Sequence, residues 1–279
     1  GTIVDWLCAS STRETMGGRP VQAVVRFNGG AQAAHHVLAP DGQPHPFAQF
    51  GSGTFTRGTR TFLSRYMLID PLALVAEAEH LKELGVHDPL GLVAADRDAL
   101  LTTPYHRAAN EARELARGAD RHGSCGLGIG ETARYALAYP DDAPRAGDMT
   151  APRTLVRKLA LLRDRLPADL AREFAGQPGF PAILGAVGFP GFPVNPDAVN
   201  PGAGERERLP STERVADVYR AVAGQITLAG DGYLKELLSA GPVVFEGAQG
   251  VLLDEWRGFH PYTTWSTTTF ENAETLLRE

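Results

Sequence analysis

Two glycine-rich stretches of this chain carry side chains that can bind or transform a small molecule. The first, RFNGGAQAAHH at residues 26–36, ends in the adjacent histidines His35 and His36. The second, FEGAQGVLLD at residues 245–254, places the amide of Gln249 between two small residues. Imidazole exchanges protons near neutral pH, and an amide both donates and accepts hydrogen bonds. These residue types predict a ligand site that combines acid–base chemistry with hydrogen-bond recognition.

Each of these side chains also has a plainer interpretation. Adjacent residues point to opposite sides of a regular element, so His35 and His36 cannot both face a ligand, and one is expected in solvent. A histidine taken alone is more often structural or solvent-facing than catalytic. A buried Gln249 that only satisfies backbone groups explains its spacing as well as a ligand contact does. Spacing alone leaves both interpretations open.

Short apolar runs precede both stretches. Residues 23–27 (AVVRF) are β-branched at their centre, and residues 242–245 (PVVF) are predicted to form a buried strand. A glycine-rich polar turn directly after such a strand is typical of a ligand site at the carboxyl edge of a parallel sheet. Strand and helix signals alternate along the chain. This order predicts an α/β fold with a mostly parallel central sheet and helices on both faces.

Helix signals place the remaining elements. Asp70 caps a helix that Pro71 opens and Gly85 ends, with Glu77 and Lys82 expected on its outer face. Other helices are expected in five places: one entered at Gly1, then residues 105–116, 151–166, a helix capped by Ser211, and residues 234–238. A further strand is expected at residues 91–94. We find no internal repeat, so we expect a single domain over residues 1–279.

Two further stretches lack a regular pattern. Residues 123–130 (GSCGLGIG) do not follow a dinucleotide fingerprint, so they predict either a flexible turn or an anion site donated by Ser124 and Cys125. Residues 176–210 are rich in Gly, Pro and Phe. A stretch of this length without periodicity is usually disordered or functional, and its interleaved phenylalanines favour an ordered, partner-facing insertion.

Composition excludes several classes of protein. The chain has 279 residues, a formal net charge of -6 and no Lys/Arg-rich run, which argues against a nucleic-acid partner. No apolar stretch approaches the length of a membrane span. Cys8 and Cys125 have no metal-site spacing and form no disulfide framework. These features indicate a cytoplasmic protein with neither nucleic-acid nor membrane partners.

Three stretches, taken in order, resemble the motifs of the adenylosuccinate synthetase family. They are residues 26–36, residues 123–131, and FEGAQGVLLD at 245–254 followed by GFHPYTTWSTTT at 258–269. The resemblance covers nearly the whole chain. The last motif is highly specific and its first part is intact, whereas the other two are recognisable but eroded.

The resemblance implies an α/β fold related to P-loop NTPases and a ligase activity. Members of the family use GTP and Mg2+ to phosphorylate the 6-oxygen of IMP, after which the amine of aspartate displaces the phosphate. An amide oxygen leaves poorly until it carries a phosphoryl group, so the chemistry is sound. The expected partners are therefore a purine nucleotide, aspartate, GTP (with ATP as an alternative) and a second copy of the chain in a homodimer.

The resemblance also implies roles for individual residues. His35 matches the general acid of the family, and Gln249 matches the amide that contacts the purine 6-position. Substrate-binding roles are implied for Gln32, Ser124, Cys125, Gln249 and Thr264. Nucleotide-binding roles are implied for Gly1, Thr2, Ala34, His35 and His36. The backbone carbonyl of Ala34 takes the place of a glycine carbonyl that helps to hold Mg2+.

Several positions depart from the family pattern. Only the last two positions of the family's P-loop are present, as Gly1 and Thr2, so we expect the residues printed here to be insufficient for catalysis. Cys125 replaces a phosphate-binding threonine, and Leu127 replaces an arginine. The arginine that reaches across the family dimer would fall near Tyr139, with Arg134 and Arg145 as distant substitutes. Losing a bidentate phosphate clamp is not conservative.

Three hypotheses remain. The protein is an adenylosuccinate synthetase-like ligase acting on IMP itself, or a specialised paralogue acting on a different oxo-heterocycle or amine. Alternatively, it is a catalytically degenerate homologue that only binds a nucleotide. Turnover by the whole protein with different purine monophosphates separates these hypotheses.

Overall fold

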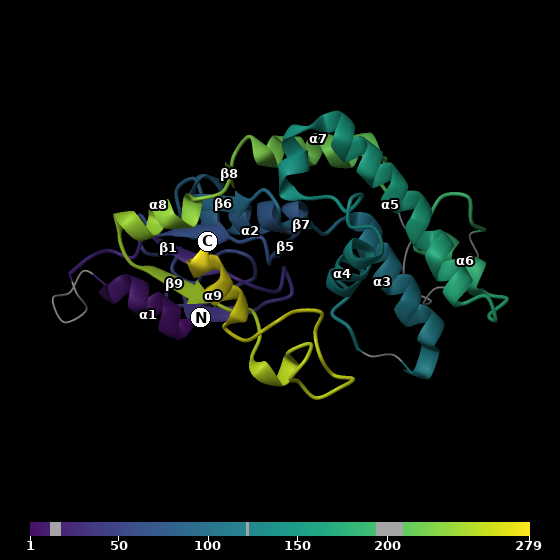
Figure 1. Cartoon of the computed structure of the whole chain (residues 1–279), viewed down its shortest axis with the longest axis horizontal. Helices are drawn as coiled ribbons and strands as arrows, with labels where there is room; N and C mark the ends of the chain where they lie inside the picture. The colour runs from purple at the N-terminus through teal and green to yellow at the C-terminus, as the bar shows by residue number, and fades with distance from the viewer. Residues whose placement is uncertain (12–17, 121–122, 194–208) are drawn as a thin grey trace. The chain divides into compact units, whose positions relative to one another are not determined.

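The computed structural model describes residues 1–11, 18–120, 123–193 and 209–279 (Figure 1). The chain divides into two compact units. The sheet unit comprises Gly1–Leu101, Arg145–Thr150 and Tyr219–Glu279, and the helical unit comprises Thr102–Pro144 and Ala151–Val218. The single-domain organisation expected from the sequence stays a prediction beside this division.

A five-stranded parallel sheet forms the centre of the sheet unit. Its strands, in spatial order, are β8 (Thr227–Ala229), β6 (Val93–Asp96), β4 (Arg60–Leu63), β1 (Ala23–Arg26) and β9 (Val243–Glu246). All four pairings are parallel, as the alternation of strands and helices predicted. Strand β1 lies between β4 and β9, and its apolar residues are fully buried, which is typical of a strand covered on both faces.

Helices cover both faces of this sheet. On one face, α1 (Thr2–Ser10) packs Val4 and Cys8 against Val24 of β1. On the other face, α8 (Tyr233–Ala240) and α9 (Glu271–Arg278) pack against a cluster that includes Val25 and Phe62. Figure 1 shows α8 and α9 beside the strands. The predicted layering is therefore confirmed.

Strand β9 differs from its prediction in one respect. We predicted a buried strand, but Val243, Val244 and Phe245 are only partly buried. The reason is position, because β9 is the edge strand of the sheet among the described residues and has a neighbour on one side only. An apolar run identifies a strand without telling a central strand from an edge strand.

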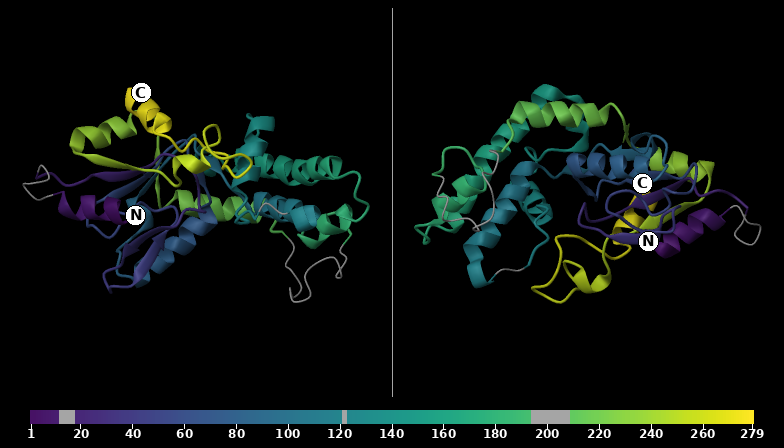
Figure 2. Two further views of the ribbon diagram at one scale, coloured as in Figure 1. Left: turned by 90° about the horizontal axis from the view of Figure 1, so that it is seen from below. Right: turned by 180° about the vertical axis from the view of Figure 1, so that it is seen from behind.

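A small hairpin and a helix complete the surroundings of the sheet edge. The hairpin consists of β2 (His35–Leu38) and β3 (Pro44–Phe47), and it lies beside α2 (Pro71–Glu83) (Figure 2). The rings of His45 in the hairpin and His80 in α2 stack with centroids 5.2 Å apart. The two-residue strands β5 (Leu68–Ile69) and β7 (Leu100–Leu101) form a separate parallel pair. Three short 3-10 helices lie at Leu90–Leu92, Ala146–Thr150 and Val251–Leu253.

Helix α2 begins as predicted, but one of its side chains is placed differently. Asp70 caps it by accepting hydrogen bonds from two backbone N–H groups. Glu77 was expected on the outer face, yet its carboxylate accepts hydrogen bonds from the backbone N–H groups of residues 48–50. Helical periodicity could not predict this, because residues 48–50 come from a distant part of the chain.

The helical unit contains α3 (Pro104–Arg117), α4 (Ile129–Ala138), α5 (Pro152–Glu173) and α6 (Phe180–Ala186). Helix α7 (Thr212–Ala223) runs from this unit into the sheet unit. Helix α5 was expected to end at Leu166, but it continues through Pro167 to Glu173. Leu170 extends its buried face, and this packing outweighs the backbone hydrogen bond that proline cannot make.

The expected partner-facing insertion at residues 176–210 is corrected in its described part. Residues 180–186 form α6, and the side chains of Phe180 and Phe189 are buried within the helical unit. Phe180 stacks on Phe174 with ring centroids 4.8 Å apart. These phenylalanines pack inward because a helix of the same unit offers them an apolar surface. Residues 194–208 lie outside the described residues.

The two cysteines and the lengths of the helices were considered from the sequence. Cys8 is buried, Cys125 is exposed, and both are free thiols. Among the described helices, none combines the length and apolar character needed to cross a lipid bilayer.

Candidate active site

The loops that follow β1 and β9 meet at the carboxyl edge of the sheet. The backbone N–H of Ala248 donates to Asn28 Oδ1 at 2.7 Å. Gly29 has a φ of +76°, and a Cβ placed on it would lie 2.4 Å from the Cβ of Ala248 and 3.2 Å from Gln249 Oε1. Only glycine combines that conformation with so close an approach. The two stretches that the sequence singled out therefore form one site.

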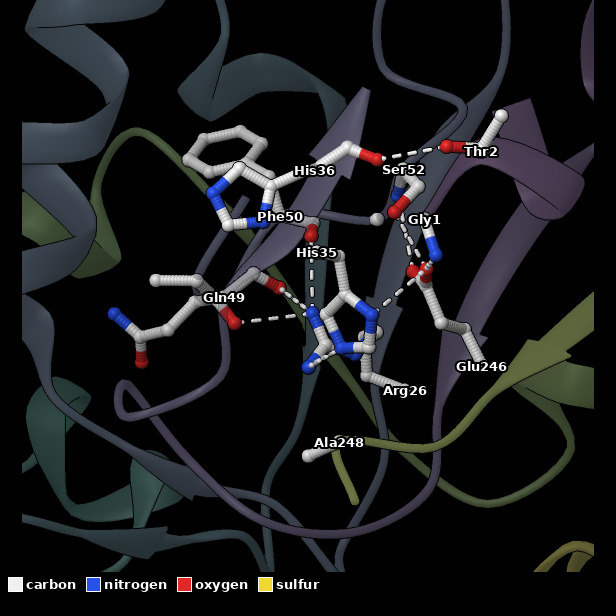
Figure 3. Close-up of polar contacts among 12 residues, drawn as sticks. Gly1, Thr2, Arg26, His35, His36, Gln49, Phe50, Ser52, Glu246 and Ala248 are labelled. Atoms are coloured by element: carbon white, nitrogen blue, oxygen red, sulfur yellow. Dashed lines mark hydrogen bonds and ion pairs between the residues drawn. The ribbon is translucent and has the colours of Figure 1, made fainter. Parts of the chain in front are cut away.

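His35 lies between two buried charged side chains (Figure 3). Its Nε2 atom is 3.3 Å from Arg26 Nη2, and its Nδ1 atom is 3.5 Å from Glu246 Oε1. Arg26 ends β1 and Glu246 ends β9, so the register of the two strands brings them side by side. His35 is largely covered, whereas His36 is exposed, as expected for adjacent residues of a strand.

The guanidinium of Arg26 is fully buried and is held mainly by backbone oxygens. Its Nη1 atom donates to the carbonyls of Ala48 and Phe50 at 3.0 Å each. Burial lowers the pKa of Arg26, and the negative charges of Glu246 and Glu77 oppose that effect. Carboxylates on both sides make the buried cation tolerable, since an unpaired buried charge is strongly destabilising.

Glu246 is fixed by a serine from another glycine-rich turn. Its carboxylate accepts hydrogen bonds from the backbone N–H of Ser52 at 3.0 Å and from the Ser52 hydroxyl. Sequence reasoning did not assign a role to Arg26, Glu246 or Ser52. The signal was present, because a charged residue at the end of an otherwise apolar strand must find a partner or a ligand.

The surroundings of His35 decide its charge. Burial is the main cause of its lowered pKa, the positive charge of Arg26 lowers the pKa further, and Glu246 opposes both. Together they bring the pKa of His35 to about 4. The imidazole is therefore neutral at physiological pH in the absence of a ligand.

Three buried side-chain amide atoms of the site lack a hydrogen-bond partner among the described residues: Asn28 Nδ2, Gln32 Oε1 and Gln249 Oε1. Leaving such a group unpaired costs about 1–3 kcal/mol, which a polar ligand could recover. The orientation of the Asn28 amide is set by its bond from Ala248, so Nδ2 remains available as a donor. The site thus offers a donor and two acceptors in buried positions.

The threonine-rich segment folds back onto these loops. Asp254 accepts a hydrogen bond from the backbone N–H of Thr268, whose hydroxyl donates to the carbonyl of Gly250. The hydroxyl oxygen of Ser266 accepts a hydrogen bond from the backbone N–H of Gly29 at 3.3 Å. Ser266 is a contact that sequence reasoning missed, although it lies within the matched motif.

Thr264, assigned to a phosphate by resemblance, is engaged within its own segment. Its hydroxyl and its backbone N–H both donate to the carbonyl of Leu253, at 3.1 and 2.8 Å. Phosphate oxygens accept hydrogen bonds, so Thr264 must release this carbonyl before its hydroxyl can donate to a phosphate.

The first turn of α1 lies against the start of β2. The Thr2 hydroxyl donates to the carbonyl of His36 at 3.1 Å, and a Cβ on Gly1 would lie 2.5 Å from the same oxygen. Ala34 and His36 are exposed beside them. The structure therefore brings together the residues that the sequence assigned to nucleotide phosphates, next to a helix N-terminus, where anions are favoured.

Ser124 and Cys125 belong to the helical unit, which is described by itself. The Ser124 hydroxyl oxygen accepts a hydrogen bond from Asn110 Nδ2 at 2.7 Å, and Cys125 is exposed. Their assigned substrate contacts stay predictions.

Tyr139, near which the cross-dimer arginine of the family would fall, also lies in the helical unit. Its hydroxyl donates to Asp169 at 3.0 Å, and the guanidinium of Arg165 lies 4.5 Å from its ring centroid. Arg165 is a cation at this position that sequence reasoning, which named Arg134 and Arg145, did not identify.

The described residues offer few side-chain ligands for a metal ion. Among the described residues, no group of three or more His, Cys, Asp or Glu side chains is arranged to hold a metal. Mg2+ is usually held by one or two protein oxygens together with water and substrate phosphates. The donor set therefore fits a Mg2+ ion that is carried by phosphates, and it does not fit a metal held by the protein alone.

The family model and the curated relatives described next belong to one family. The family model described as adenylosuccinate synthetase matches residues 1–173 and 205–277. The adenylosuccinate synthetase of Syntrophobacter fumaroxidans is 30% identical over 255 residues, and that of a Marinomonas species is 34% identical over 257 residues. These alignments cover 90% and 91% of this chain but 51% of each relative. The chain thus spans about half the length of these curated relatives.

A solved structure has a similar fold. The structure of fully ligated adenylosuccinate synthetase from Plasmodium falciparum matches 99% of this chain and 56% of its own, with a TM-score of 0.68. Because the two sequences are only 17% identical, this likeness shows the fold alone. It confirms the predicted α/β fold with a mostly parallel sheet.

Proposed function

Because this chain belongs to the adenylosuccinate synthetase family, we propose that the whole protein is a ligase joining aspartate to IMP or an IMP-like oxo-purine. In this proposal GTP phosphorylates the 6-oxygen of the purine. The amine of aspartate then displaces the phosphate and forms a C–N bond. The oxygen departs with the phosphoryl group, so the poor leaving group of the free purine is avoided.

The observation that carries the proposal is the meeting of the His35 loop and the Gln249 loop. Gln249 lies against Gly29, and unpartnered amide atoms of Asn28 and Gln249 are buried in the same place. A purine with a 6-oxo group offers a carbonyl acceptor beside a ring N–H donor. Asn28 Nδ2 can donate to the first, and Gln249 Oε1 can accept from the second.

His35 serves as a hydrogen-bond donor to charge that develops on the transferred phosphoryl group. Its pKa of about 4 keeps it neutral in the free protein. A phosphate placed beside it stabilises the imidazolium form and raises that pKa, because opposite charges favour ionisation. Ligand binding therefore moves His35 toward the protonation state that a general acid needs.

The residues near the first turn of α1 receive the nucleotide phosphates. Gly1, Thr2 and His36 lie together there. The backbone carbonyl of the neighbouring Ala34 would supply one oxygen to Mg2+. When bound, Mg2+ neutralises phosphate charge and orients the transferred group. Thr264 contacts the phosphate of the purine nucleotide once its hydroxyl is released from the carbonyl of Leu253.

The protein works as a homodimer in the cytoplasm. Its phosphate-binding residues differ from the common family pattern. Leu127 and Cys125 replace residues that bind phosphate in the family, and neither can supply a bidentate cationic clamp. These changes favour an IMP-like nucleotide that differs from IMP in its ring or its phosphate-bearing group, with IMP itself as the alternative, while recognition of the 6-oxo group is retained.

A turnover assay tests the proposal. The whole protein is supplied with Mg2+, aspartate, GTP or ATP, and a panel of purine monophosphates that carry a 6-oxo group, beginning with IMP. We expect phosphate release and a succinyl-amino product, identified by mass spectrometry, with at least one of them. Nucleotide binding without a product from any of them would overturn the proposal in favour of a degenerate nucleotide-binding homologue.

A further inference from the structure

The backbone of residues 48–50 is hydrogen-bonded to a guanidinium on one side and to a carboxylate on the other. On one side, Arg26 Nη1 donates to the carbonyls of Ala48 and Phe50. On the other side, Glu77 accepts from the backbone N–H groups of Ala48 and Gln49 at 2.8 and 2.9 Å. The peptide groups of this segment therefore link a buried guanidinium to a carboxylate of α2.

The same segment also forms hydrogen bonds with the start of α2. Gln49 Nε2 donates to the carbonyl of Asp70 at 3.0 Å, and Gln49 Oε1 accepts from the backbone N–H of Asp70 at 2.9 Å. Both atoms of the amide are used, so the segment cannot shift without breaking a pair of buried bonds. Arg26 is thus held by a rigid support.

Arg26 makes one further contact, to Nε2 of His35 at 3.3 Å. A guanidinium only donates hydrogen bonds, so this Nε2 must accept, and the single proton of the neutral ring must be on Nδ1. Nδ1 faces the carboxylate of Glu246, which accepts. In the opposite tautomer, two donors would meet at Arg26 and two acceptors would meet at Glu246.

We propose that Arg26 is a positioning residue that holds His35 as its Nδ1–H tautomer, and that Glu77 positions Arg26 through residues 48–50. Both ring nitrogens are then engaged, Nδ1–H with Glu246 and Nε2 with Arg26, so the ring is held in one defined tautomer and orientation instead of a mixture of two forms. The tautomer follows from the contacts of the free protein, whereas its use in catalysis rests on the proposed function.

Nuclear magnetic resonance of the ring nitrogens tests the tautomer directly. In nitrogen-15-labelled protein, long-range correlations distinguish a protonated ring nitrogen from an unprotonated one, and His35→Gln identifies the His35 signals by their loss. Near neutral pH we expect His35 to show an unprotonated Nε2 and a protonated Nδ1. A protonated Nε2, or rapid averaging between both forms, in the unmodified protein would overturn the proposal.

Two variants test the roles of Arg26 and Glu77 in selecting the tautomer of His35. Arg26→Lys keeps a cation but cannot bond the backbone segment and His35 together, and Glu77→Gln keeps the shape of the side chain without its charge. We expect both to populate the Nε2–H form. Glu79→Gln, an exposed residue of the same helix, is the matched control and should leave the His35 signals unchanged. If folded Glu77→Gln keeps the unmodified spectrum, the assignment to Glu77 is wrong.

Turnover separates this proposal from the proposed function. With the best purine substrate, Arg26→Lys should lower kcat at least about tenfold and change KM much less, as expected when only the reacting geometry is disturbed. An inactive protein with the expected His35 tautomer would reject the ligase proposal and keep the positioning role. An active protein with the opposite tautomer would reject the positioning role and keep the ligase proposal.

Discussion

Arg26 and Glu246 are register partners at the carboxyl ends of the parallel strands β1 and β9. Both side chains are buried, they carry opposite charges, and His35 lies between them. The central histidine of the site is therefore held by the register of the sheet itself. A one-residue slip of β9 would turn Glu246 to the other face and leave Arg26 without its nearest carboxylate.

The first prediction concerns this pair. Glu246→Gln should lower the free energy of unfolding by about 3 kcal/mol, because it leaves a buried guanidinium with less compensating charge. Urea denaturation followed by circular dichroism measures the change. Glu236→Gln, at an exposed position of α8, is the control and should have little effect. Equal stability of both variants would show that Glu246 does not compensate Arg26.

The second prediction concerns the proposed acid. His35→Gln should reduce turnover of the whole protein by about 100-fold or more, the usual contribution of a positioned proton donor. Initial rates of phosphate release with saturating purine and aspartate measure it. His87→Gln, at an exposed site away from the sheet edge, should retain the full rate. A similar rate in both variants would remove His35 from the mechanism.

The third prediction concerns the contact between the two loops. Gly29→Ala should destabilise the protein by about 1–3 kcal/mol more than Gly42→Ala, which is the cost expected of overpacking. Both glycines have positive φ angles, but only a Cβ at position 29 meets another atom closely. The comparison thus isolates the steric term from backbone strain. Equal melting temperatures for the two variants would argue against a close approach of the loops.

The fourth prediction concerns pH. Burial lowers the folded-state pKa of His35 to about 4 and that of His106 to about 3, both below the value of about 6.5 expected in the unfolded chain. Their contribution to stability is present above about pH 6.5 and is lost as the pH falls toward the folded values. The charged side chains that face His35 are Arg26 and Glu246.

Urea denaturation at several pH values measures this dependence. We expect the free energy of unfolding to fall between about pH 6.5 and pH 4, and to fall less steeply in His106→Gln. His106 also caps α3, because its Nδ1 accepts a hydrogen bond from the backbone N–H of Thr103, so this variant is compared with itself across pH. A flat profile in the unmodified protein would contradict the buried neutral state of both histidines.

Much of the fold was predictable from local patterns. The apolar runs of β1 and β9, the cap of α2 and the glycine-rich turns after the strands all identified their elements. Placement of Glu77, Phe180 and β9 was not predictable. Each depends on which distant segment packs against it, and that information is absent from the periodicity of a single element.

The candidate site shows the same division. The sequence predicted that the His35 loop and the Gln249 loop each follow a strand of a parallel sheet, and the structure shows that the two loops meet where these strands end. The contacts of Arg26 and Glu246 with His35 depend on strand order and register, which spacing does not determine. Thr264 illustrates a second limit, because its hydroxyl is taken by the nearby carbonyl of Leu253. Local competition of this kind is invisible to a motif.

The central claim is that the purine 6-oxygen is phosphorylated before aspartate attacks, at the place where His35 and Gln249 meet. The most direct measurement follows that oxygen. The whole protein is supplied with Mg2+, GTP, aspartate and its best purine substrate labelled with oxygen-18 at the 6-position, and the released phosphate is analysed by mass spectrometry. We predict that the label appears in the phosphate. Unlabelled phosphate released together with a succinyl-amino product would contradict the claim.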